Sequence, residues 1–83
     1  MWFVYIVQCA DNSLYTGSCK DVARRVDEHN HDDKKGARYT KVRRPVQLVY
    51  QESCSDRSAA GKREAAIKKL TRQKKLQLIN AGS

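Results

Sequence analysis

Two runs of apolar, β-branched and aromatic residues open the chain and predict a β-hairpin. The first run is Phe3–Val7, and the second is Leu14–Gly17. Residues of these types are typical of strands. Asp11–Ser13 lies between the runs, and its residue types are typical of a turn. The pattern therefore predicts two antiparallel strands joined by a short loop.

The loop length decides whether the two tyrosines of this hairpin share a face. Side chains alternate along a strand, so a two-residue loop would put Tyr5 and Tyr15 on opposite faces. We expect an odd-numbered loop, which pairs Tyr15 with Cys9 and gathers both phenols, Val7 and Gly17 on one face. The bare glycine beside the phenols would let the backbone of a ligand approach.

The next segment has the spacing of a short helix followed by a long polar link. Asp21 is a good N-cap, and the apolar stripe behind it predicts a helix over residues 22–30. Arg25 and His29 are spaced i, i+4 and share one face of this helix. Arg25 is either a functional cation there or the partner of a surface acid such as Asp21. The link over residues 31–44 shows no apolar period, and loops of this length in small domains are usually functional or disordered.

The remaining chain predicts one more strand and two helices. Alternation over residues 45–50 predicts the third strand. A main helix begins at two cap residues and spans about 55–70. A last short helix follows over residues 72–80, in which Leu76 and Ile79 fold back. The order β-β-α-β-α-α predicts a small α+β domain.

One carboxylate on the main helix is notable for its position. Glu64 falls in the apolar stripe that contains Ile67, so it lies on or beside the face that packs on the sheet. A buried charge without a partner is costly, so Glu64 requires a cation, a metal or a hydrogen-bond network. The plain alternative is a structural ion pair with Arg63, Lys68 or Arg25.

Length, net charge and cysteine content limit the kinds of partner and cellular compartment that we expect for this chain. Its 83 residues predict a single domain, 1–83, with a formal net charge of +8. The charge predicts a polyanionic partner, first nucleic acid and second an anionic membrane surface. The apolar opening is too short to span a bilayer, and three cysteines without paired spacing favour reduced thiols in the cytoplasm. A zinc site would need Cys9, Cys19, His29 and His31, whose spacing fits no usual pattern.

Two phenols on a sheet face, an arginine on the following helix and a lone acid in a basic stretch suit phosphodiester hydrolysis. Glu64 can hold a divalent cation, Mg²⁺ or Mn²⁺, that keeps most of its waters and binds a phosphate oxygen. Arg25 can bind a phosphate oxygen and stabilise growing negative charge. A tyrosine can hydrogen-bond the attacking water, but its ordinary pKa near 10 requires neighbouring cations before it acts as a base.

The strings themselves resemble the signature of the GIY-YIG nuclease superfamily. Its two parts match Val4-Tyr5 and Tyr15-Thr16-Gly17. Arg25 stands where that family has its catalytic arginine, His29 where it has a histidine or tyrosine, and Glu64 where it has its metal-binding glutamate. Several separate motifs therefore agree.

A second match lies between these motifs. The strings Gly36–Thr40 and Arg43–Tyr50 are similar to the small stand-alone bacterial group of this superfamily. That group is also similar to the nuclease subunit of the eukaryotic structure-selective junction endonuclease. The resemblance extends from about Trp2 to Lys75 and so covers nearly the whole chain.

The resemblance implies both a fold and a chemistry. The fold is a three-stranded antiparallel sheet flanked by helices. The chemistry is cleavage of nucleic acid with one divalent metal on Glu64 and Arg25 on the scissile phosphate. Tyr5 or Tyr15 would orient or activate water, and which tyrosine is the base varies across the family. His29 belongs to the same catalytic set.

Three positions depart from the family pattern. Phe3 replaces the glycine of the first motif, which changes little in a strand. Ser18 follows the second motif. Excision-repair relatives carry a lysine slightly further on, and here only Lys20 could take its place. A late asparagine has no clear match, although Asn80 is nearby in sequence. The last two departures bear on efficiency more than on reaction type.

No separate DNA-recognition domain fits in this length, so selectivity must come from the polar link, from the basic helices or from a protein partner. Basic residues interleaved with an aromatic suit phosphates and a stacked base. The alternative is an exposed loop in which the tyrosine of the link is a local anchor. The candidate nucleic-acid contacts are Gly17, Lys20, Arg38, Tyr39, Lys41, Arg43, Arg44, Lys68 and Arg72.

Three functions fit these observations. The leading hypothesis is a metal-dependent DNA endonuclease, with branched, flapped or nicked DNA in repair or recombination as its substrate. The alternative is a nucleic-acid-binding module without turnover, or a subunit of the same fold that a partner activates, with RNA as a second ligand. The third is a structural or adaptor protein whose charge only provides affinity.

Overall fold

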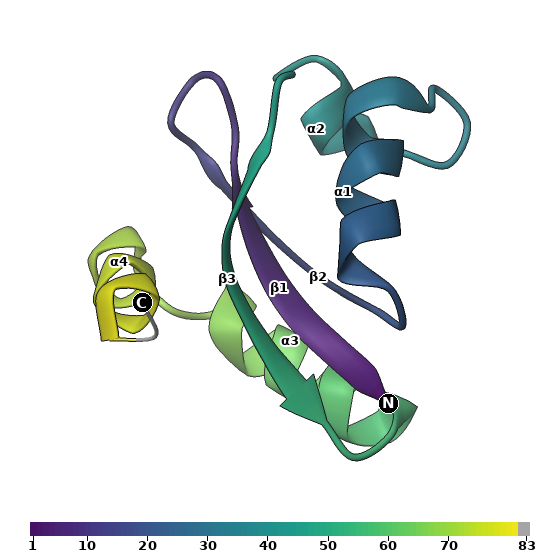
Figure 1. The fold of residues 1–83 in the computed structure, drawn as a ribbon. Coiled ribbons are helices and arrows are strands. Elements are labelled where there is room, and N and C mark those ends of the chain that lie inside the picture. The colour runs from purple at the N-terminus through teal and green to yellow at the C-terminus, as the bar shows by residue number, and fades with distance from the viewer. Residues whose placement is uncertain (82–83) are drawn as a thin grey trace.

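The computed structural model describes residues 1–81, which form three strands and four helices (Figure 1). In chain order they are β1 (Trp2–Gln8), β2 (Leu14–Cys19), α1 (Val22–His31), α2 (Arg38–Lys41), β3 (Gln47–Cys54), α3 (Arg57–Lys68) and α4 (Arg72–Ala81). The strands form one antiparallel sheet in the order β2-β1-β3. The expected α+β class is confirmed, and so is the order of its strands and long helices.

Helices cover both faces of the sheet. Figure 1 shows α1 and α2 on one face and α3 on the other, so the central strand β1 is buried on both sides. The cluster on the α1 face contains Tyr5, Val7, Cys9, Val22 and Val46. The cluster on the α3 face contains Val4, Ile6, Ala60 and Ile67. No helix within the described residues is long and apolar enough to cross a membrane.

The hairpin has the odd-numbered loop that the sequence predicts. Tyr5 and Tyr15 accordingly pack on the same face of the sheet. The expected pairing of Tyr15 with Cys9 is wrong, because Tyr15 pairs with Val7. Cys9 belongs to the loop, where its N–H donates to the carbonyl oxygen of Ser13 at 2.8 Å. The longer loop shifts the pairing but keeps every side chain on its expected face.

Strand β3 is displaced from its expected place. It covers residues 47–54 instead of 45–50, and its register against β1 is irregular at one point. There Val49 is an extra residue between the paired Leu48 and Tyr50. Leu48 packs on the α1 face and Tyr50 on the α3 face. The expected alternation therefore ends at a β-bulge, where a strand changes which face its side chains reach.

The helices differ from the expectation in detail. The link over residues 31–44 contains α2, which is too short to show an apolar period in the sequence. Helix α3 ends at Lys68, close to the expected boundary. In α4, Ile79 packs against the sheet cluster as expected, together with Leu78. Leu76 does not fold back, because it is 37% exposed.

Candidate active site

Tyr5 is the buried centre of the site. It lies on β1, is 1% exposed and pairs across the strands with Gly17. A Cβ on Gly17 would collide with the Tyr5 hydroxyl and lie 2.7 Å from its Cζ. The space that we expected to admit a ligand is therefore filled by Tyr5. Burial raises the pKa of this phenol, and hydrogen bonding and charge from Arg25 offset only part of that effect.

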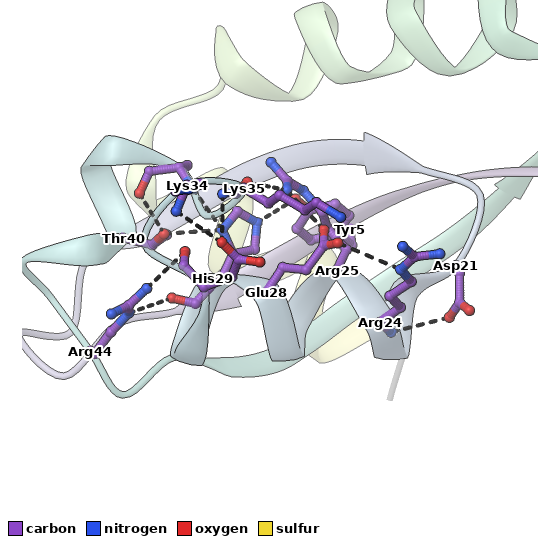
Figure 2. A network of polar contacts seen from close by, with 12 residues as sticks. Tyr5, Asp21, Arg24, Arg25, Glu28, His29, Lys34, Lys35, Thr40 and Arg44 are labelled. Atoms are coloured by element: carbon purple, nitrogen blue, oxygen red, sulfur yellow. Dashed lines mark hydrogen bonds and ion pairs between the residues drawn. The ribbon is translucent and has the colours of Figure 1, made fainter.

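His29 on α1 holds the Tyr5 hydroxyl and is itself fully buried (Figure 2). Its Nε2 lies 2.7 Å from Tyr5 Oη, and its Nδ1 lies 3.0 Å from Thr40 Oγ1. The backbone N–H of Ala37 also donates to Nδ1, at 3.2 Å. Burial, and then the charge of Arg25, lower the pKa of His29 to about 4. The imidazole is therefore neutral at neutral pH.

Arg25 lies one turn before His29 on the same helix, as its spacing predicts (Figure 2). Its Nη1 donates to Glu28 Oε1 at 3.1 Å and to the backbone carbonyl of Lys35. The partner acid is therefore Glu28 and not Asp21, whose side chain caps α1 instead. The Arg25 side chain is still 27% exposed, so its guanidinium can be reached from the surface.

Glu64 lies on α3 at the rim of the apolar cluster and has the ion pair that its position requires. Its Oε2 is 2.7 Å from Lys68 Nζ, and its side chain is 23% exposed. Partial burial alone would raise the pKa of Glu64, but hydrogen bonds from Lys68 and from Ser18 on β2 bring this pKa below its usual range. Arg63, another expected partner, instead pairs with Glu52 on β3.

Tyr15 on β2 packs against the buried His29 and against Tyr39. Its ring centroid lies 5.4 Å from that of His29 in an edge-on arrangement and 5.7 Å from that of Tyr39 in a stack. The pKa of Lys68 is raised mainly by its hydrogen bond to Glu64 and more weakly by the neighbouring Tyr15 phenol. The strand β2 lies at the edge of the sheet and also contacts α3. Side chains from the two faces of the sheet therefore come close together along this edge.

The donor atoms at this edge fit a hard divalent cation held by few protein ligands. Among residues 1–81, no three His, Cys, Asp or Glu side chains gather into a group that could hold a metal ion. The four-ligand zinc set is therefore not formed, and the three cysteines are free. Mg²⁺ is commonly held by one or two carboxylates, with waters and substrate phosphates completing its shell. A partly exposed Glu64 fits that mode once Lys68 moves aside.

Two arginines of the link, Arg43 and Arg44, contact the protein itself. Arg43 Cζ lies 4.0 Å from the ring centroid of Tyr39, and Arg43 Nε lies 3.1 Å from Asp11 on the hairpin loop. Arg44 donates from Nε to the backbone carbonyl of His29 at 2.7 Å. Arg43 and Tyr15 both contact the Tyr39 ring, which is still 38% exposed. The expected contact of Tyr39 with nucleic acid therefore stays a prediction.

The other candidate nucleic-acid contacts lie on the surface of several elements. Arg38 and Lys41 are exposed on α2, and Lys68 and Arg72 are exposed on α3 and α4. Lys20 is exposed after β2, with its Nζ 5.6 Å from the ring centroid of Trp2.

Three residues of the site were not predicted. Thr40 is fully buried against His29, and Ala37 contributes only its backbone N–H. Neither residue type signals such a role in a sequence. Glu28 pairs with both Arg24 and Arg25. Its i, i+4 and i, i+3 spacing from these arginines was a signal that could have identified it.

The fold and the site define a class of protein. The family described as the GIY-YIG catalytic domain matches residues 1–77, and the chain belongs to this family. Membership points to the nucleases and to a nucleic-acid substrate. The suspected family is therefore confirmed.

Its relatives are small bacterial proteins. The UPF0213 protein DP2720 of Desulfotalea psychrophila is 61% identical over 80 residues, which cover 96% of this chain and 72% of the relative. A UPF0213 protein of Staphylococcus aureus strain Mu3 is 64% identical over 77 residues, with coverage of 93% and 92%. These relatives agree with the expected small stand-alone group.

Two solved structures share the fold. The solution NMR structure of the UPF0213 protein BH0048 from Bacillus halodurans is 40% identical, with a TM-score of 0.62 and coverage of 100% of this chain and 88% of that one. The NMR structure of EF2693 from E. faecalis is 42% identical, with a TM-score of 0.63 and coverage of 95% and 82%.

Proposed function

We propose that this protein is a metal-dependent endonuclease that hydrolyses phosphodiester bonds in DNA. The observation that carries the proposal is that two groups of polar residues lie near one sheet edge. In the first, Tyr5 hydrogen-bonds to His29, whose ring packs edge-on against Tyr15, and Arg25 lies one turn away on α1. In the second, Lys68 pairs with Glu64 on α3, which contacts the strand β2 that carries Tyr15. Residues far apart in the sequence thereby form one polar site in a chain with a net charge of +8.

Arg25 binds the scissile phosphate in this proposal. Its guanidinium is partly exposed and is oriented by Glu28 and by the Lys35 carbonyl. An arginine held in this way presents its remaining N–H donors to phosphate oxygens in a fixed fork. It then stabilises the negative charge that grows on those oxygens in the transition state.

Tyr5 or Tyr15 supplies the hydroxyl that orients the attacking water. The raised pKa of Tyr5 keeps its phenol protonated at neutral pH in the resting protein. Proton removal from water therefore requires the extra positive charge that arrives with the substrate complex. Arg25 already favours the phenolate form of Tyr5, and the charge of Lys68 interacts with the Tyr15 phenol.

Glu64 is the residue that would hold a divalent cation, Mg²⁺ or Mn²⁺. When bound, such an ion supplies Lewis-acid stabilisation of the phosphate and of the leaving oxygen. Lys68 balances the Glu64 charge until then, so the carboxylate is not left unpaired at the edge of the apolar cluster. Released from Glu64, the Lys68 ammonium becomes available to a phosphate of the nucleic acid.

The test is a cleavage assay on labelled duplex, single-stranded, flapped, splayed-arm and four-way-junction DNA, with Mg²⁺, Mn²⁺ or EDTA. Glu64→Gln keeps the size of the side chain and removes its charge, and Arg25→Ala removes the phosphate ligand. Loss of one such electrostatic contact typically lowers kcat about 10²–10³-fold. Asp27→Asn is the matched control, because Asp27 is an exposed acid on α1.

Metal-dependent nicking that both site variants lose and the control keeps supports the nuclease. The ranking of the panel then tests whether branched DNA of repair or recombination is the preferred substrate, as we propose. We also propose the cytoplasm as the compartment of this activity. Cleavage that persists in Glu64→Gln contradicts the metal assignment. Unfolding of Glu64→Gln, read from its circular dichroism, would recast the Glu64–Lys68 pair as structural.

One observation favours a second candidate, a binding module that a protein partner activates. Glu64 is paired with Lys68, and Arg25 with Glu28, so both charged site residues already have partners within the chain. This module would bind nucleic acid without cutting it under any divalent metal. Its affinity would fall with salt, by about 0.9 in the log–log slope for each phosphate neutralised. Competition between matched DNA and RNA ligands would identify the preferred polymer.

A further inference from the structure

The turn before α2 contains a donor that restricts the chemistry of His29. The backbone N–H of Ala37 points at His29 Nδ1, with 3.2 Å between the two nitrogens. A backbone N–H can only donate, so Nδ1 must present its lone pair to it. A proton on Nδ1 would face the Ala37 proton across a buried contact, because His29 is fully buried.

We propose that the Ala37 N–H fixes His29 as the neutral tautomer with its proton on Nε2, so that His29 donates a hydrogen bond to Tyr5 and cannot take the Tyr5 proton. The Nε2–Oη distance of 2.7 Å is that of a strong hydrogen bond. The lowered pKa of His29 agrees with a neutral ring, since a doubly protonated ring would also confront Ala37.

The competing arrangement uses Thr40 instead. In it, Nδ1–H donates to Thr40 Oγ1 at 3.0 Å, and the Thr40 hydroxyl donates to the Ala37 carbonyl at 3.0 Å. The Tyr5 hydroxyl would then donate to Nε2, and His29 would be positioned as its base. A hydroxyl rotates to suit either arrangement, whereas the amide proton of Ala37 has a fixed direction. The fixed donor therefore decides between the two.

The assignment changes the role of His29 in the proposed reaction, and its catalytic consequence rests on the proposed function. Tyr5 Oη accepts from His29 and also interacts with Arg25. Both contacts strengthen as negative charge grows on the phenol oxygen. His29 is thus a positioning residue that stabilises a phenolate, and the Tyr5 proton must leave toward the substrate side or solvent.

The decisive measurement is long-range ¹H–¹⁵N NMR of the whole protein labelled at histidine, at neutral pH. We expect the His29 pattern of an Nε2–H tautomer, together with a scalar coupling across the hydrogen bond between Ala37 N and His29 Nδ1. A proton found on Nδ1 overturns the proposal. This experiment needs neither DNA nor metal, so its failure is distinct from failure of the proposed nuclease activity.

A variant separates the two donors near Nδ1. Thr40→Val keeps the shape of the side chain and the Ala37 N–H but removes the hydroxyl, and the Ala37 carbonyl keeps the Lys41 N–H as a partner. We expect the His29 tautomer in this variant to be unchanged. A switch of tautomer in Thr40→Val would assign control to Thr40 and contradict the proposal.

The direction of the hydrogen bond between His29 and Tyr5 also predicts the cleavage rates of two variants. His29→Gln retains a side-chain N–H donor for Tyr5, whereas His29→Met retains none. One buried hydrogen bond is worth about 1.4 kcal/mol, so we expect about tenfold faster nicking in His29→Gln than in His29→Met. Equal rates in the two variants would contradict the proposal, because loss of a base would slow both variants alike.

Discussion

The two faces of the central strand carry different kinds of core. On the α3 face, Val4, Ile6, Ala60 and Ile67 form a cluster of apolar side chains. On the α1 face, Tyr5 is buried with the polar His29 and Thr40 in a hydrogen-bonded group. One strand therefore supports an apolar anchor on one side and a polar site on the other.

This difference shows where the fold can accommodate buried polar groups. Buried polar groups are stable only when their hydrogen bonds are satisfied, and the α1 face provides these partners from α1 and from the turn at residues 36–40. The α3 face is mostly aliphatic, although the buried Thr16 hydroxyl beside Ile6 has no hydrogen-bond partner among the described residues. Its main contribution is hydrophobic stabilisation, which adds to that of the apolar residues on the α1 face. Substitutions on the two faces should consequently separate stability from catalysis.

The largest stability loss is expected on the apolar face. Ile67→Ala removes a fully buried side chain of α3, and such truncations typically cost about 2–5 kcal/mol. Urea denaturation of the variant measures this directly. In conditions where it is still folded, its cleavage rate per folded molecule should stay within about threefold of wild type, since the variant leaves the transition-state contacts intact. A selective loss of cleavage would mean that the packing of α3 also positions Glu64 for the reaction.

On the polar face, the loss of a single buried hydroxyl should already lower the stability. Tyr5→Phe keeps the ring and leaves His29 Nε2 buried without its partner, which costs about 1–3 kcal/mol. Tyr15→Phe is the matched control, because Tyr15 is only half-buried and its change should stay within about 0.5 kcal/mol. Unfolding midpoints of the two variants test the contrast. Equal losses would show that the Tyr5–His29 bond contributes no special stability.

The same contrast gives a pH dependence. The pKa of His29 is about 4 in the folded protein and about 6.5 when unfolded, so the unfolded chain takes up the proton first. Stability associated with neutral His29 is fully present above pH 6.5 and falls as the pH drops toward 4, by at most about 1.4 kcal/mol per unit. Urea titrations across this window measure the slope. His29→Gln should remove this component, and an unchanged slope in that variant would assign it to other groups.

Much of the fold was predictable because it follows from local patterns. Cap residues and apolar spacing place α1, α3 and α4, and strand composition places the hairpin. The end of β3 was not predictable, because the bulge at Val49 depends on pairing with β1 and leaves no mark in the alternation. Helix α2 is likewise fixed by tertiary contacts, such as that of Thr40 with His29.

The candidate site likewise combines features that follow from local sequence patterns with features that depend on tertiary packing. Tyr5, Tyr15 and Glu64 stand at positions that the motifs and spacing single out, although their catalytic roles stay predictions. The spacing could not tell that Tyr5 itself fills the space over Gly17, nor that a backbone amide would meet His29. Such facts arise only when distant segments pack together, because neither a missing Cβ nor a main-chain N–H has a sequence signal of its own.

The smallest expected effect tests the edge where the two faces meet. Lys68→Gln removes the ammonium that balances Glu64, and an ion pair with this much exposure contributes about 0–1 kcal/mol. We therefore expect the stability to change little and the affinity of Glu64 for Mn²⁺ to rise by up to about fivefold, because the competing cation is gone. Electron paramagnetic resonance of free Mn²⁺ measures this affinity, with Lys62→Gln as the control for net charge. A weaker affinity in Lys68→Gln would mean that Lys68 supports the metal site, and Mn²⁺ binding that persists in Glu64→Gln would place the cation elsewhere in the protein.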